Sequence, residues 1–132
     1  NVTDSTATVA LRWSETRVPF EIAVNTTAIL RSRAEEMMSE ASDWRAPLPY
    51  VGYALENEIL LDEALAWINR SIELKERFGN VRMKANVLAA TGQYAQAVET
   101  GNAALSMAEG MEESPNGLEQ LRDQIETWKS EQ

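Results

Sequence analysis

The stretch LDEALAWINRSIEL, residues 61–74, is matched 33 positions later by YAQAVETGNAALSM, residues 94–107. A small residue stands at the same point of both stretches, Ala64 in the first and Ala97 in the second. Ile72 and Leu105 form a second matched pair. Apolar residues in each stretch recur at spacings of three and four, which is typical of one buried helix face. The sequence therefore predicts two copies of one helical unit.

A period near 34 residues, with an aromatic or apolar residue three positions before a small one, resembles the tetratricopeptide pattern. In such repeats each unit is a pair of antiparallel helices, so every copy needs a partner helix. We predict helices over about 26–41, 50–58, 62–77, 80–91, 94–109 and 118–128. Two repeats leave both flanks uncovered, and the first and last of these helices are the expected caps. The predicted fold class is mainly α: an N-terminal β hairpin followed by a right-handed tetratricopeptide-like solenoid of about six helices.

Turn and cap residues set the expected ends of these helices. Thr26 or Thr27 is suited to cap the first helix, and Pro49 suits the first turn of the second. Gly79 is the expected left-handed residue after the third helix, and Gly92 ends the fourth.

Residues 7–24 alternate between apolar and polar, which predicts two half-buried strands. Polar residues 14–16 form the turn between them. An isolated hairpin is marginal in water, so its apolar face requires cover from the helices, a second copy or further strands. Because a strand follows so soon after Asn1, we expect residues 1–25 to be the end of a truncated β domain. Residues 26–132 form the tetratricopeptide-like domain, and a homodimer through the hairpin edge is possible in this reading.

The amino-acid composition excludes several classes of partner and several kinds of catalytic and metal site. The chain has 132 residues, 44% of them hydrophobic, and a net charge of −9, so nucleic acid and anionic membranes are poor partners. No apolar stretch is long enough for membrane insertion. Neither Cys nor His occurs, which removes thiolate chemistry, the commonest general base and the commonest metal ligands. We expect no catalytic residues, no metal and no cofactor.

Two groups of segments carry a resemblance to a known family: 1–8, 11–18 and 20–22 in the β part, and 64–72, 84–85 and 92–94 in the helical part. Together they resemble domain of unknown function 2911, a bacterial family. The β part is similar to the strands that close that family's N-terminal domain, and the helical part is similar to the segment that follows it. The resemblance implies an exported protein of the periplasm or cell envelope, with no settled activity.

The best candidate site is the groove lined by the first helix of each pair. Aligning Gly52 with Ala85 at the small packing position selects residues on both inner helices. One helical turn separates Arg82 from Asn86, so their side chains can act on one peptide carboxylate. A solvated polar face, or a face covered by the first helix or the hairpin, is the plainer interpretation. The predicted groove residues are Tyr53, Glu56, Asn57, Arg82 and Asn86.

Other chemistry-bearing residues have structural explanations. Ser71 and Lys75 have the spacing of a Ser–Lys pair, but Ser71 is expected to be buried at a helix crossing. Trp67 is expected in the core. Neighbouring carboxylates such as Glu35 and Glu36 diverge around a helix and are expected to face solvent.

We therefore predict a non-enzymatic module that binds a protein or peptide. The alternative is a structural support or dimerisation segment for the missing N-terminal domain, and in that case any enzymatic activity would belong to that domain.

Overall fold

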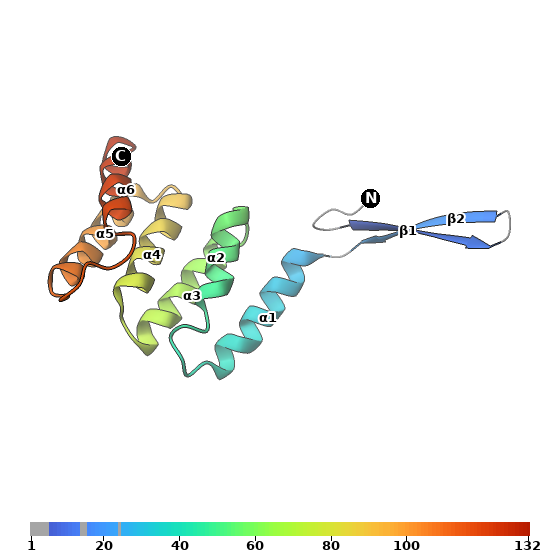
Figure 1. Cartoon of the computed structure of the whole chain (residues 1–132), viewed down its shortest axis with the longest axis horizontal. Helices are drawn as coiled ribbons and strands as arrows, with labels where there is room; N and C mark the ends of the chain where they lie inside the picture. Colours follow the sequence, from blue (N-terminus) through green and yellow to red (C-terminus); the bar gives the residue numbers. More distant parts are fainter. Residues whose placement is uncertain (1–5, 14–15, 24) are drawn as a thin grey trace.

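The computed structural model describes residues 6–13, 16–23 and 25–132, and within them the chain is mainly helical. Six helices follow one another along the array in Figure 1. The prediction of six helices is confirmed in number and order for this part of the chain. The helices are α1 (Thr26–Glu40), α2 (Leu48–Asn57), α3 (Leu61–Leu74), α4 (Phe78–Ala90), α5 (Tyr94–Glu109) and α6 (Leu118–Ser130). None of these helices is long and apolar enough to cross a membrane.

Two strands precede the helices, β1 (Thr6–Trp13) and β2 (Thr16–Ala23). Their backbones pair antiparallel, with Thr6 opposite Ala23 and Trp13 opposite Thr16. Pro19 stands opposite Ala10 in this register. The prediction that Thr16 belongs to the turn is wrong, because it is the first residue of β2 and pairs with Trp13. The other two predicted turn residues, 14 and 15, the opening segment 1–5 and residue 24 lie outside the described residues.

The core has two parts, and α4 contributes to both. One part joins α1, α2 and α3 to the buried Val87 and the partly buried Met83 of α4. The other joins the opposite side of α4, including Ala85, to α5 and α6. Because α4 is buried on two sides, it connects α1, α2 and α3 to α5 and α6. The buried residues of the first part are Ala34, Val51, Ala54, Ala64, Trp67, Ile68 and Val87, and the main ones of the second are Phe78, Val81, Ala85, Leu88, Ala97, Ala104, Leu121, Ile125 and Trp128.

The two stretches related by 33 residues share three buried positions, including those of Ala64 and Ser71. Ala64 and Ala97 are both fully buried, as are Ser71 and Ala104. The helices that contain them begin at corresponding residues, Leu61 and Tyr94. The partner helices match less closely. Ala85 is fully buried, whereas Gly52 is only half-buried, and a Cβ there would meet nothing within 4 Å.

Several helix ends differ from the sequence prediction. The side chain of Asn25 caps α1 by accepting a hydrogen bond from the Ala28 amide at 3.0 Å, so the predicted threonine cap is wrong. Gly79 lies within α4 and is not left-handed. The prediction for Gly92 is confirmed, because it has a φ of 79° just after α4.

The α3–α4 turn closes without a left-handed glycine because Asn80 supplies its hydrogen bonds. Asn80 is fully buried. Its Oδ1 accepts from the Arg77 amide at 2.8 Å, and its Nδ2 donates to the Lys75 carbonyl at 2.8 Å. The same Nδ2 donates to Ser71 Oγ at 3.0 Å, and Ser71 Oγ donates to the Trp44 carbonyl. One buried amide thus ties the α3–α4 turn to the loop before α2.

A glycine in α5 allows α6 to approach closely. A Cβ on Gly101 would lie 2.8 Å from Ile125 Cγ1, so Gly101→Ala forces α6 outward. Overpacking costs about 1–3 kcal/mol, and the better helix propensity of alanine returns up to about 1 kcal/mol. We expect a net loss of about 1 kcal/mol in the free energy of unfolding, measured by urea denaturation.

Gly52→Ala is the matched control, since Gly52 also lies inside a helix but has open space around its Cβ position. This change is expected to stabilise the protein by about 0.5–1 kcal/mol. Equal effects of the two substitutions would contradict the close approach of α6 to Gly101.

Candidate functional site

Three of the predicted groove residues lie at the surface of α2. Tyr53 is 37% exposed, and Glu56 and Asn57 are also exposed. Asn57 Nδ2 donates to the Tyr53 carbonyl at 2.9 Å, which satisfies an acceptor in the last turn of the helix. Tyr53 and Glu56 therefore present their side chains to solvent, while the Asn57 amide is engaged by its own helix.

The other two predicted groove residues, Arg82 and Asn86, lie on α4. Arg82 Nη2 donates to Gln120 Oε1 of α6 at 2.9 Å, and Nη1 donates to the Asn116 carbonyl at 3.4 Å. The guanidinium also passes over Gly117, where an added Cβ would overlap it. Arg82 thus holds α6 and the loop before it.

Three polar atoms near this contact are buried and have no hydrogen-bond partner among the described residues. They are Arg82 Nε, Asn86 Oδ1 and Gln124 Oε1. A buried donor or acceptor without a partner costs about 1–3 kcal/mol. The set comprises one donor and two acceptors. We call Arg82, Asn86, Gln120 and Gln124 the α4–α6 seam.

The structure brings the predicted residues onto neighbouring helices, because α2 and α4 are in contact. Sequence reasoning missed the contribution of α6. Gln120 and Gln124 are one turn apart and stand next to the buried Leu121 and Ile125, so their spacing indicated that they lie beside the buried face of a helix. The spacing could not show that Gln120 contacts Arg82 on α4.

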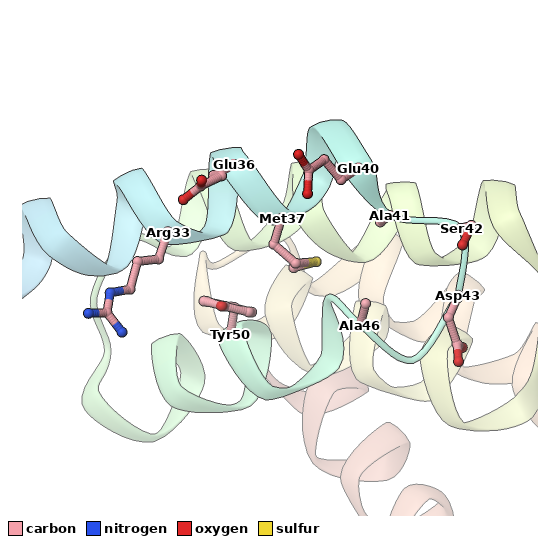
Figure 2. A pocket seen from close by; sticks show the side chains of 9 residues that line it. All are labelled: Arg33, Glu36, Met37, Glu40, Ala41, Ser42, Asp43, Ala46 and Tyr50. Atoms are coloured by element: carbon pink, nitrogen blue, oxygen red, sulfur yellow. The ribbon is translucent and has the colours of Figure 1, made fainter.

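A second concave surface lies between α1 and α2, which we call the α1–α2 pocket. It has a volume of about 650 Å³. Met37 projects into it from α1, and Tyr50 lies below on α2 (Figure 2). The Tyr50 ring is held edge-on to the buried Trp67, with ring centroids 6.4 Å apart and an interplanar angle of 74°. The pocket is lined by Arg33, Glu36, Met37, Glu40, Ala41, Ser42, Asp43, Ala46 and Tyr50.

One carboxylate of this pocket is already paired. Arg45 Nη2 lies 2.9 Å from Asp43 Oδ2, Arg45 Nε donates to Oδ1 at 3.1 Å, and the Arg45 amide donates to the same oxygen. These bonds, led by the side-chain hydrogen bond from Arg45, lower the pKa of Asp43 below its ordinary value of 3.8. The Arg45 guanidinium also lies 5.9 Å from the centroid of the Trp44 ring.

Replacing Arg45 with alanine should raise the pKa of Asp43 back toward 3.8, which carboxyl NMR titration measures. Because the folded-state pKa is the lower one, the pair stabilises the fold above the unfolded-state pKa, and this contribution disappears as the pH falls through the folded value. Arg33→Ala is the control, since it removes an arginine that lines the pocket but forms no bond to Asp43. An unchanged Asp43 pKa in the Arg45→Ala variant would contradict the pairing.

Ser71 does not form an exposed Ser–Lys pair. Its side chain is fully buried, and Oγ both donates to the Trp44 carbonyl and accepts from Asn80. The prediction that Ser71 is structural is confirmed. Trp67 is also confirmed in the core, with 4% of its surface exposed.

Comparison of the chain with protein-family models, curated proteins and solved structures gives no match.

Proposed function

We propose that this chain is a non-enzymatic module that binds a protein or peptide along a tetratricopeptide-like groove. In this proposal α2–α3 and α4–α5 are two repeats of a right-handed solenoid, and α1 and α6 are its caps. The burial of matching small residues 33 positions apart supports the repeat. The groove is then the surface shared by α2, α4 and α6.

The observation that carries the proposal is the set of side chains that the neighbouring helices α2 and α4 present at the surface, the exposed Tyr53 and Glu56 and the half-buried Asn86. A peptide lying across α2 and α4 would contact all three. Arg82 then serves mainly to position α6, because Gln120 and Asn116 already occupy its terminal nitrogens.

Selection from a random peptide display library against the folded chain tests this proposal. The affinity of a selected peptide is then measured by fluorescence polarisation. Tyr53→Ala and Asn86→Ala should each weaken binding about tenfold, equivalent to about 1.4 kcal/mol. Glu109→Gln, on the exposed end of α5, is the control and should leave the affinity unchanged. A peptide that binds all variants equally would contradict the groove.

The second candidate is a support or dimerisation segment for an N-terminal domain. One observation favours it: only two residues separate the end of β2 at Ala23 from the start of α1 at Thr26. α1 is in turn joined to α3 by the Arg31–Glu63 ion pair at 2.9 Å. A dimer formed through the hairpin edge would dissociate on dilution, which light scattering measures, and a strict monomer at high concentration would contradict it.

The resemblance to domain of unknown function 2911 extends the proposal to location. We propose that the whole protein is exported to the periplasm or cell envelope of a bacterium. Fractionation of cells that express the full-length protein tests this, and recovery in the cytoplasmic fraction alone would contradict it.

A further inference from the structure

We propose that the α1–α2 pocket binds a basic side chain, arginine or lysine, presented by a peptide segment of a partner protein. The cation lies between Glu36 and Glu40, and its alkyl stem lies on Met37 and Tyr50. This surface is separate from the α4–α6 seam, so it does not depend on peptide binding there.

Two carboxylates without an ion-pair partner among the described residues lie at one side of the pocket. Glu36 and Glu40 stand one turn apart on α1, and both are exposed. Neither takes part in an ion pair within the described part of the chain. Like charges at this spacing destabilise a helix. A cation placed between them removes that repulsion and adds two favourable contacts.

The third carboxylate that lines the pocket, that of Asp43, is already paired. Asp43 is bound by Arg45, and Glu63 is bound by Arg31 at 2.9 Å. The pocket therefore has two carboxylates left for an incoming cation. With a net charge of −9, the chain as a whole also attracts basic partners.

An apolar and an aromatic side chain also line the pocket, those of Met37 and Tyr50. Met37 projects between α1 and α2, and Tyr50 lies below it (Figure 2). Because the Tyr50 ring rests edge-on against Trp67, its orientation is fixed before a ligand arrives. Lysine and arginine have apolar stems with a charged end, and aromatic rings attract their cations. Carboxylates above a tyrosine and a methionine match both parts of such a side chain.

The volume of the pocket and the charge of Arg33 restrict which residues can flank the bound basic side chain. A volume of about 650 Å³ is in the range of ligand pockets and exceeds one side chain, so flanking peptide residues also fit. Arg33 is at the opposite end of the pocket from Asp43 and extends away from Glu40 in Figure 2. Its positive charge disfavours a second basic residue at that end. We therefore expect a single basic residue flanked there by a neutral or acidic one.

An NMR titration with N-acetyl-arginine methylamide as the probe tests the proposal. Shift changes should map to α1, the 41–47 loop and the start of α2. N-acetyl-citrulline methylamide has nearly the same shape without the charge and should bind at least about fivefold more weakly. Equal shifts with both probes, or a map centred on another part of the chain, would overturn the proposal. N-acetyl-lysine methylamide, compared with the arginine probe, shows which cation is preferred.

The variant that removes the pocket carboxylates and its control change neighbouring residues of α1. Each exposed ion pair changes affinity on the order of threefold, so Glu36→Gln combined with Glu40→Gln should weaken arginine binding about tenfold. Glu35→Gln removes a charge from the same helix at an exposed residue that does not line the pocket. It should leave the affinity within about twofold of the parent chain. Equal losses from both changes would show that only net charge attracts the probe and would reject the site. Tyr53→Ala and Asn86→Ala should leave this titration unchanged, so failure here is distinguishable from failure of the groove.

Discussion

Replacing Trp67 with alanine is expected to lower the free energy of unfolding by about 4 kcal/mol. Trp67 lies on α3 with 4% of its surface exposed, in the core cluster that joins α2 to α4 through Val51 and Val87. Its ring also supports Tyr50 by an edge contact. Small helical domains have few kcal/mol to spare, so the variant should be largely unfolded at moderate urea. Urea denaturation followed by far-UV circular dichroism measures this loss.

Trp44→Ala is the matched control for this prediction. The Trp44 side chain is half-buried, and it is the backbone carbonyl, which any residue retains, that accepts the bond from Ser71. Its removal should therefore cost about 1 kcal/mol, well below the cost at Trp67. Similar losses at the two positions would show that α3 does not form the centre of the first core cluster.

Replacing the buried Asn80 with aspartate is expected to cost about 3 kcal/mol at neutral pH. The substitution keeps the acceptor for the Arg77 amide but removes both hydrogen atoms donated by Nδ2. The Lys75 carbonyl and Ser71 Oγ then face an acceptor, and Ser71 cannot donate to it while it donates to Trp44. A carboxylate would thus be buried next to two oxygens, which raises its pKa in the folded state.

The pH dependence separates this mechanism from a simple packing defect. Because the folded-state pKa of the introduced carboxyl is the higher one, its protonated form favours folding, and part of the lost stability should return as the pH falls through that value. Asn80→Ala should lose about 2 kcal/mol with no such recovery. Asn102→Asp, the same chemical change at an exposed residue of α5, should have little effect. Urea denaturation at several pH values measures all three, and a loss for Asn80→Asp that does not change with pH would contradict the network.

The sequence was sufficient to place the predicted groove residues on two helices. It was not sufficient to predict the hydrogen-bond partners of their side chains. Helical spacing placed Arg82 and Asn86 on one face, and that placement needed only the sequence. The partners of Arg82 come from α6 and the loop before it, 38 and 34 residues further along the chain respectively. The α1–α2 pocket was missed for the same reason. Glu36 and Tyr50 line one pocket only when α1 and α2 both pack on α3, where Trp67 supports the tyrosine ring.

Apolar periodicity was sufficient to predict the six helices and most of the apolar residues on their buried faces. Periodic apolar residues such as Leu121, Ile125 and Trp128 specify a buried face whatever lies opposite, because burial depends on hydrophobicity and helix geometry alone. Tertiary structure decided how the segments begin and join. Asn80 closes the turn before α4 through bonds to Ser71 and Lys75, and so Gly79 does not need to be left-handed. Such contacts depend on side chains brought together by packing, and their energies exceed the local preferences that a sequence pattern expresses.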